Sequence, residues 1–140
     1  MPKFNHVCVI DDDPIYTYLA DKVMKMVDFS NYIEFFKDGE AALNSLKPRL
    51  RSGRNIPNVI FLDLNMPVID GWQFLDEIIE NFIEPVEKKV IIYIITSSIV
   101  PEYIEKAESY SIVDKYVVKP ITTEMLEQLF EEVEEKKEST

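Results

Sequence analysis

Residues 59–71 read VIFLDLNMPVIDG, an apolar run that passes directly into an acidic residue. Val59 to Leu62 are branched or aromatic, and a short apolar run bounded by turn residues is typical of a buried β-strand. Asp63 follows without a spacer, and the Asn-Met-Pro sequence close behind it predicts a turn. The residues that the fold brings near Asp63 therefore decide whether it is a turn residue or part of a site.

Apolar runs of strand length recur along the chain, and stretches with helical spacing separate them. The runs cover residues 7–10, 32–35, 59–62, 90–95 and 116–118. Alternation of this kind predicts parallel strands that right-handed crossovers connect, with helices on both faces of the sheet. The predicted fold class is α/β, a doubly wound parallel sheet of five strands.

Capping residues mark the start of each predicted helix. Asp13-Pro14 begins the first, because aspartate is a good N-cap and proline suits the first helical position. Asp38-Gly39 begins a second helix that runs through Leu46. The remaining starts are Asp70 with Gln73 as a capping box, Pro101-Glu102, and Thr122 or Thr123.

Side-chain environments are predicted for three parts of the chain. In the first helix, we expect the apolar stripe Ile15, Leu19, Val23 and Val27, with Tyr16, Ala20 and Met24 beside it. The basic residues of segment 47–54 are expected in a solvated loop. His6 is expected to have no partner and to be a structural or exposed residue.

Length and composition predict one compact domain. The chain has 140 residues, of which 46% are hydrophobic, enough for one core without disulfides. We expect a core over about residues 5–133 and a charged tail over 134–140. The net charge of −11 argues against nucleic-acid binding, which needs a basic surface. The three glycines are too widely separated to form a phosphate-binding loop.

The cysteine content and the lack of targeting patterns predict the cellular location of the protein. Cys8, the single cysteine, lies in an apolar run and is predicted to be a buried core residue. A single cysteine suits a reducing compartment. Because the sequence has no basic-then-apolar leader and no run of membrane-spanning length, we expect a soluble cytoplasmic protein with no membrane partner.

Polar residues follow four of the five predicted strands. In open α/β sheets, ligands bind outside the carboxyl ends of the strands, so these residues are predicted to converge. Taken singly, each could be an ordinary cap or turn residue. They are Asp11, Asp12 and Asp13 after the first strand, Asp63 after the third, Thr96 and Ser97 after the fourth, and Lys119-Pro120 after the fifth.

Carboxylates that converge in this way need a cation or a proton. Two negative charges about 4 Å apart repel by roughly 4 kcal/mol at an effective dielectric constant of about 20. Oxygen ligands without histidine or cysteine favour Mg²⁺, with Mn²⁺ as an alternative. A lysine and a hydroxyl nearby would complete a phosphoryl-binding pocket. One carboxylate would then remain as the nucleophile, as in aspartyl-phosphate chemistry.

Four motifs together resemble the receiver domain of two-component response regulators, over essentially the full length of the chain. They are VIDDD at residues 9–13, FLDLNMPVIDG at 61–71, ITSS at 95–98 and YVVKPIT beginning at Tyr116. The resemblance implies a flavodoxin-like fold of five strand–helix repeats with the strand order 2-1-3-4-5.

The resemblance also implies a role for each acidic site residue. Asp63 matches the phospho-accepting aspartate. Asp11 and Asp12 match the acidic pair that holds Mg²⁺, with Asp12 as the direct ligand and Asp11 acting largely through water. Asn65 would contribute its backbone carbonyl to the metal.

Four further residues take their roles from the same resemblance. Lys119 would pair with the phosphoryl group, and its bond to Pro120 is expected to be cis. Thr96 and Tyr116 match the pair of switch residues, in which the hydroxyl turns to the phosphoryl group and the aromatic ring fills the space it leaves. The side chains of Asn65 and Ser98 would tune hydrolysis of the acyl phosphate.

The function implied is that of a stand-alone response regulator. A histidine kinase or a histidine phosphotransfer protein would donate a phosphoryl group to Asp63, and a surface of the fourth helix, fifth strand and fifth helix would bind a protein target. The chain would not be an enzyme beyond forming and hydrolysing its own acyl phosphate. We expect a monomer or a weak dimer.

Several alternatives share parts of this pattern. A phosphorelay shuttle would pass the phosphoryl group on to another histidine, and a degenerate receiver would serve only as a scaffold. A phosphatase of the haloacid-dehalogenase type needs a second aspartate where this chain has Asn65. A flavodoxin-like electron carrier would bind the phosphate of FMN, which the run Asp11–Asp13 would repel.

Overall fold

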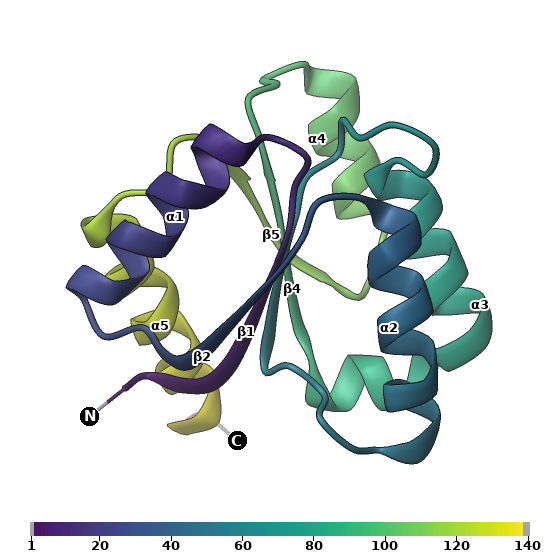
Figure 1. Ribbon diagram of the computed structural model, residues 1–140, viewed down its shortest axis with the longest axis horizontal. Coiled ribbons are helices and arrows are strands. Elements are labelled where there is room, and N and C mark those ends of the chain that lie inside the picture. Colours follow the sequence, from purple (N-terminus) through teal and green to yellow (C-terminus); the bar gives the residue numbers. More distant parts are fainter. Residues whose placement is uncertain (1, 139–140) are drawn as a thin grey trace.

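A five-stranded parallel sheet forms the centre of the molecule, with helices on both faces (Figure 1). The computed structural model describes the backbone of residues 2–138 and, apart from 81–89 and 137–138, their side chains. The elements are β1 (Phe4–Ile10), α1 (Pro14–Met26), β2 (Ser30–Phe36), α2 (Gly39–Ser52), β3 (Val59–Leu62), α3 (Gly71–Lys89), β4 (Ile91–Thr96), α4 (Pro101–Glu108), β5 (Val113–Val118) and α5 (Thr123–Glu138).

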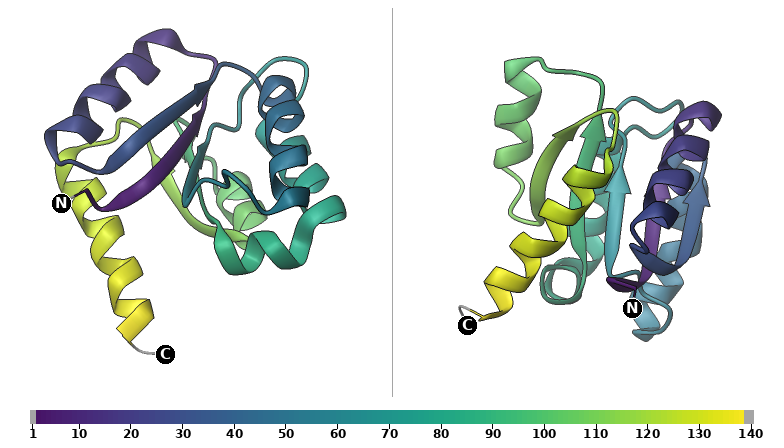
Figure 2. Two further views of the ribbon diagram at one scale, coloured as in Figure 1. Left: turned by 60° about the horizontal axis from the view of Figure 1, so that its bottom comes forward. Right: turned by 90° about the vertical axis from the view of Figure 1, so that its left-hand side faces the viewer.

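The strand order is β2-β1-β3-β4-β5, and every neighbouring pair is parallel, as predicted. α1 and α5 cover one face of the sheet, while α2 and α3 cover the other (Figure 1). All strand arrows in the right-hand panel of Figure 2 point to the same edge, so the carboxyl ends of the strands lie together there. That edge carries the candidate site.

The central strands are apolar along their whole length because both of their faces are covered. In β1, Val7 and Val9 pack in the core under α1 and α5, whereas Cys8 and Ile10 pack in the core on the side of α2 and α3. The four residues of β3 alternate between the same two cores. Cys8 is fully buried, as predicted.

The helix starts agree with the capping residues in the sequence. Asp13 accepts hydrogen bonds from the backbone N–H groups of Ile15 and Tyr16, and Pro14 is the first residue of α1. Asp70 and Gln73 form a reciprocal capping box at 2.9 Å in both directions. At the start of α5, the capping residue is Thr122, whose hydroxyl accepts from the N–H of Met125.

The predicted stripe of α1 was wrong by one position. Tyr16, Ala20 and Met24 face the sheet and are buried, whereas Ile15 is 73% exposed and Leu19 is 49% exposed. Val23 and Val27 pack against the edge of the same core. The two stripes are neighbours on the helix surface, so the position of the helix on the sheet selects between them.

The second helix is longer than predicted and includes part of the segment expected to be a loop. Pro48 lies inside α2, which continues through Ser52. Leu50 is buried in the core, and Gly53 ends the helix in the left-handed conformation, with φ of 72°. Burial of Leu50 and this glycine cap stabilise the last turn despite the proline.

His6 has a partner, contrary to the prediction. Its Nε2 lies 2.9 Å from Oε1 of Glu34. The same oxygen accepts a hydrogen bond from the Arg49 guanidinium at 2.8 Å. Arg49, expected in a solvated loop, thus ties α2 to β2. The interactions with His6 and Arg49 lower the pKa of the Glu34 carboxyl against the opposing effect of burial.

Candidate functional site

Asp63 lies at the end of β3 and is held there by backbone contacts. Its N–H donates to the carbonyl of Ile10 at 2.9 Å, and the residue is 4% exposed. The chain then folds back so that the N–H of Gly71 donates to the carbonyl of Leu64 at 3.0 Å. A Cβ on Gly71 would lie 2.7 Å from the backbone oxygen of Asp63, so only glycine fits this approach.

Two further carboxylates come from the loop after β1. Asp11 is buried, and one of its oxygens accepts from the N–H of Asp13 at 2.9 Å, while Asp12 is exposed. Carboxylate oxygens of Asp11, Asp12 and Asp63 all lie within 4.8 Å of one another. An all-oxygen cluster of this size fits a hard divalent cation such as Mg²⁺.

Lys119 extends from the end of β5 into the carboxylate cluster. Its Nζ lies 2.7 Å from Asp11 Oδ2 and 3.7 Å from Asp63 Oδ1. The Lys119–Pro120 peptide bond is cis, as predicted, and the N–H of Lys119 donates to the carbonyl of Thr96 at 2.8 Å. The lysine thus places one positive charge between two buried carboxylates.

The cluster still carries unfavourable negative charge. Burial, together with the nearby Asp11 carboxylate, raises the pKa of Asp63 to about 6, while Lys119 opposes the shift. Burial likewise raises the pKa of Asp11 against the opposing contact with Lys119. A divalent cation bound here would favour the ionised forms of both groups.

The two predicted switch residues both bond to Ser98. Thr96 is fully buried at the end of β4, and its hydroxyl accepts from the N–H of Ser98 at 3.3 Å. Tyr116 is half-buried on β5, and its hydroxyl donates to the carbonyl of Ser98 at 2.8 Å. The segment between β4 and α4 is therefore connected to both residues.

Asn65 lies on the surface of the loop after β3, and its backbone N–H partly offsets the rise in the pKa of Asp63. It lines a pocket of about 320 Å³ with Asp12, Asp70, Trp72 and Tyr103, among others. The role of its carbonyl as a metal ligand stays a prediction.

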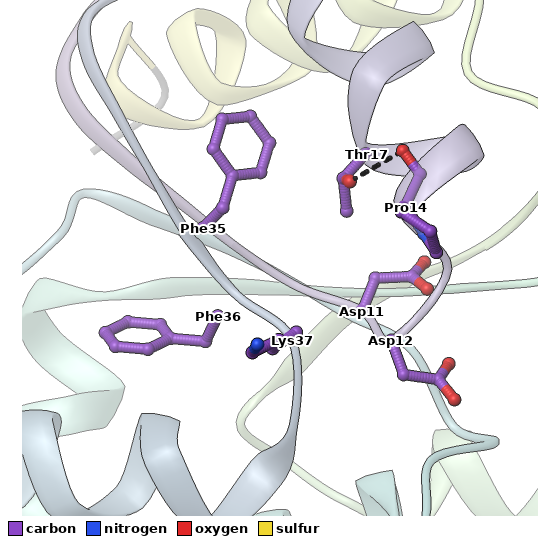
Figure 3. Close-up of a pocket in the computed structure, with 7 residues that line it drawn as sticks. All are labelled: Asp11, Asp12, Pro14, Thr17, Phe35, Phe36 and Lys37. Atoms are coloured by element: carbon purple, nitrogen blue, oxygen red, sulfur yellow. Dashed lines mark hydrogen bonds between the residues drawn. The ribbon is translucent and has the colours of Figure 1, made fainter.

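A second pocket, of about 550 Å³, lies on the other side of the acidic pair (Figure 3). Phe35 and Phe36 point to opposite sides of β2. The carboxylates of Asp11 and Asp12 lie to the right of both rings in Figure 3. The sequence motifs did not indicate this pocket, because its aromatic residues belong to a strand without a site motif. It is lined by Asp11, Asp12, Pro14, Thr17, Phe35, Phe36 and Lys37.

One contact of the site was not expected from the sequence. The ammonium of Lys119 lies over the ring of Tyr16, 4.1 Å from its centre. The sequence predicts Tyr16 only as an apolar residue of the first helix. The one feature of the sequence that places Tyr16 near the site is its position in the first turn of the helix, shortly after the acidic residues.

Comparison with known proteins agrees with this arrangement. The family model described as the response regulator receiver domain matches residues 7–131. This chain belongs to the response regulator receiver family. The match runs from within β1 into α5, and so includes every predicted site residue.

Relatives of the receiver occur among solved structures and curated proteins. A two-component response regulator from Cytophaga hutchinsonii is 36% identical, with a TM-score of 0.83 over 92% of this chain and 96% of that one. The probable methanogenesis regulatory protein FilR2 of Methanothrix harundinacea is 28% identical over 92% of this chain and 81% of its own length. Response regulator Rcp1 of Synechocystis is 29% identical over 66% of this chain and 61% of its own length.

Among the described residues, no helix is both long and apolar enough to cross a bilayer.

Proposed function

We propose that this receiver accepts a phosphoryl group on Asp63 from a phosphohistidine of a histidine kinase or a histidine phosphotransfer protein. The observation that carries the proposal is the position of Lys119, whose ammonium lies 2.7 Å from Asp11 and 3.7 Å from Asp63. A nucleophilic carboxylate beside a fixed ammonium is the arrangement that transfer of an anionic phosphoryl group requires.

In the proposed reaction, an Asp63 oxygen attacks phosphorus in line with the leaving group. The P–N bond to the donor imidazole breaks, an O–P bond to Asp63 forms, and the imidazole nitrogen takes up a proton. Lys119 compensates charge on the phosphoryl oxygens. Water later cleaves the acyl phosphate. The chain would turn over this acyl phosphate and no other substrate.

Mg²⁺ would be held by Asp11, Asp12, Asp63 and the carbonyl of Asn65. The fit rests on three carboxylates whose oxygens lie within 4.8 Å and on the unfavourable charge of the buried pair. When bound, the ion would supply positive charge that offsets the carboxylates and the phosphoryl oxygens. Mn²⁺ would be accepted by the same oxygen ligands.

The effect of phosphorylation would reach the target-binding surface through the segment between β4 and α4, which contains Ser98. If the Thr96 hydroxyl turned to a phosphoryl oxygen on Asp63, its bond to Ser98 would be lost. The hydrogen bond from the Tyr116 hydroxyl to the carbonyl of Ser98 would then break or change its geometry. We infer that the surface of α4, β5 and α5 would change in this way and bind a protein target.

Intact-mass spectrometry after incubation with acetyl phosphate and Mg²⁺ tests the proposal. We expect one phosphoryl increment in the unaltered chain, and none after chelation of Mg²⁺ or in Asp63→Asn. An increment that persists in Asp63→Asn would refute Asp63 as the acceptor. If a purified phosphotransfer protein then removes the phosphoryl group and becomes phosphorylated itself, the chain acts as a phosphorelay shuttle.

A further inference from the structure

Tyr16 lies against the site without belonging to its motifs. It occupies the first turn of α1, is 7% exposed, and has its ring 4.1 Å from the ammonium of Lys119. The lysine side chain is itself 16% exposed, so both partners of this contact are largely removed from water. A cation over an aromatic face is attracted by the ring quadrupole, and more strongly when it is desolvated.

The ring of Tyr16 is better fixed than the lysine it contacts. It packs in the core under α1 and α5, together with Ala20, Ile121 and Leu126 among others. Lysine, by contrast, carries a compact charge on a flexible four-carbon stem. Two carboxylates and one aromatic face therefore surround the Lys119 ammonium.

The hydroxyl of Tyr16 does not explain the presence of a tyrosine here. It is buried, and within the residues whose side chains are described it makes no hydrogen bond. Burial and the carboxylates of Asp11 and Asp63 raise the pKa of Tyr16, so the hydroxyl keeps its proton at neutral pH. The ring face is the part of this side chain that contacts the site.

We propose that Tyr16 is a positioning residue for phosphoryl transfer: its ring face holds the Lys119 ammonium beside Asp63. This inference rests on the proposed function. It differs from a purely structural role because it requires the ring face, not merely a side chain that fills the core.

Three variants separate these roles. Tyr16→Phe keeps the ring and removes the hydroxyl, whereas Tyr16→Leu removes the ring. Phe29→Leu is the matched control, because Phe29 is fully buried in the same core but lies at the opposite end of the sheet, where its carbonyl accepts from the N–H of Phe4. Thermal unfolding first establishes the temperature at which all three variants are folded.

Phosphorylation by acetyl phosphate, in which acetate leaves as the O–P bond to Asp63 forms, gives the first readout. We expect Tyr16→Leu to lower the saturating rate constant about tenfold. Tyr16→Phe and Phe29→Leu should stay within about twofold of the unaltered chain, since each retains an aromatic ring under Lys119. Equal losses in both Tyr16 variants, or an equal loss in Phe29→Leu, would overturn the proposal.

Nuclear magnetic resonance of the Lys119 side chain gives a second readout that needs no phosphorylation. A ring face close to the ammonium shifts the neighbouring ε-methylene protons upfield. We expect this shift in the unaltered chain and in Tyr16→Phe, and its loss in Tyr16→Leu. If the shift were absent from the unaltered chain, the ring contact would be refuted. If instead the shift were present but acetyl phosphate left no phosphoryl group, the proposed function would fail while the contact stood.

Discussion

Val68 adopts a backbone conformation that a β-branched residue rarely takes. Its φ is 67°, in the left-handed region, and the residue is 77% exposed, so little packing compensates for the strain. The N–H of Ile69 donates to the carbonyl of Pro67 at 2.8 Å, which closes a tight three-residue turn around it. This turn joins Asp63 to the start of α3.

Replacing Val68 with glycine should therefore stabilise the protein. Relief of strain is worth about 1–3 kcal/mol, and the extra freedom of glycine in the unfolded chain costs about 0.5–1 kcal/mol. We expect urea denaturation to show a net gain of about 1 kcal/mol, with Val68→Ala giving less. A loss of stability in Val68→Gly would mean that the valine side chain makes a favourable contact that outweighs the strain.

Aromatic residues connect α3 and α4 beside the site. Trp72 stacks on Tyr110 with ring centres 5.8 Å apart, and Lys106 lies 4.7 Å from the centre of the Trp72 ring. Tyr110 donates to Asp76 on α3 at 2.7 Å. The short helix α4 buries only Ala107 fully, so these contacts supply much of its attachment to α3.

Where β4 pairs irregularly with β5, the side chain of Asp114 provides a hydrogen-bond acceptor for a backbone N–H group. The register shifts between Ile92 and Tyr93, and the N–H of Ile92 donates to the carboxylate of Asp114 at 3.1 Å. Burial raises the pKa of Asp114, and the bond from Ile92 opposes that shift. The carboxylate thus satisfies a backbone group at the irregularity, as buried amides require.

Removing this carboxylate should weaken the edge of the sheet. We expect Asp114→Ala to lower the free energy of unfolding by about 1–2 kcal/mol, because the Ile92 amide loses its partner. Glu132→Gln is the control, since it weakens only the half-exposed pair of Glu132 with Lys115 and should cost less than about 1 kcal/mol. Chemical denaturation measures both, and equal effects would contradict the role assigned to Asp114.

At the scale of the whole molecule, the site lowers the stability of the fold that carries it. The pKa of Asp63 rises from an ordinary value of 3.8 to about 6 when the chain folds. The folded state therefore binds the proton more tightly than the unfolded state does. The stability linked to this group is fully present below about pH 4 and is lost as the pH rises through about 6.

Asp63→Asn should accordingly be more stable than the unaltered chain at pH 7. The pKa shift corresponds to a gain on the order of 2–3 kcal/mol, which should shrink as the pH falls from 6 to 4. Thermal and urea unfolding across this pH range, without divalent cations, measures the difference. Asp21→Asn, which removes a carboxylate paired with Lys25 on α1, is the control variant. A difference in Asp63→Asn that did not change with pH would refute the assignment to the buried charge.

The sequence by itself determined the class of fold and the family. The alternation of apolar runs with capped helical stretches predicted the five parallel strands, because covering both faces of a sheet makes its strands apolar throughout. The polar residues at the strand ends predicted the cluster of Asp11, Asp12 and Asp63 with Lys119. The strand order and the individual site roles came from the resemblance that four motifs carried together.

Only the tertiary structure decided which surfaces meet. Two neighbouring stripes of α1 are apolar, and packing on the sheet buried Tyr16 while leaving Ile15 exposed. Core burial of Leu50 continued α2 beyond Pro48, where local propensity predicts an end. The contact of Tyr16 with Lys119 joins residues about a hundred positions apart. Sequence spacing reports local geometry along one element, whereas such contacts depend on how separate elements pack in space.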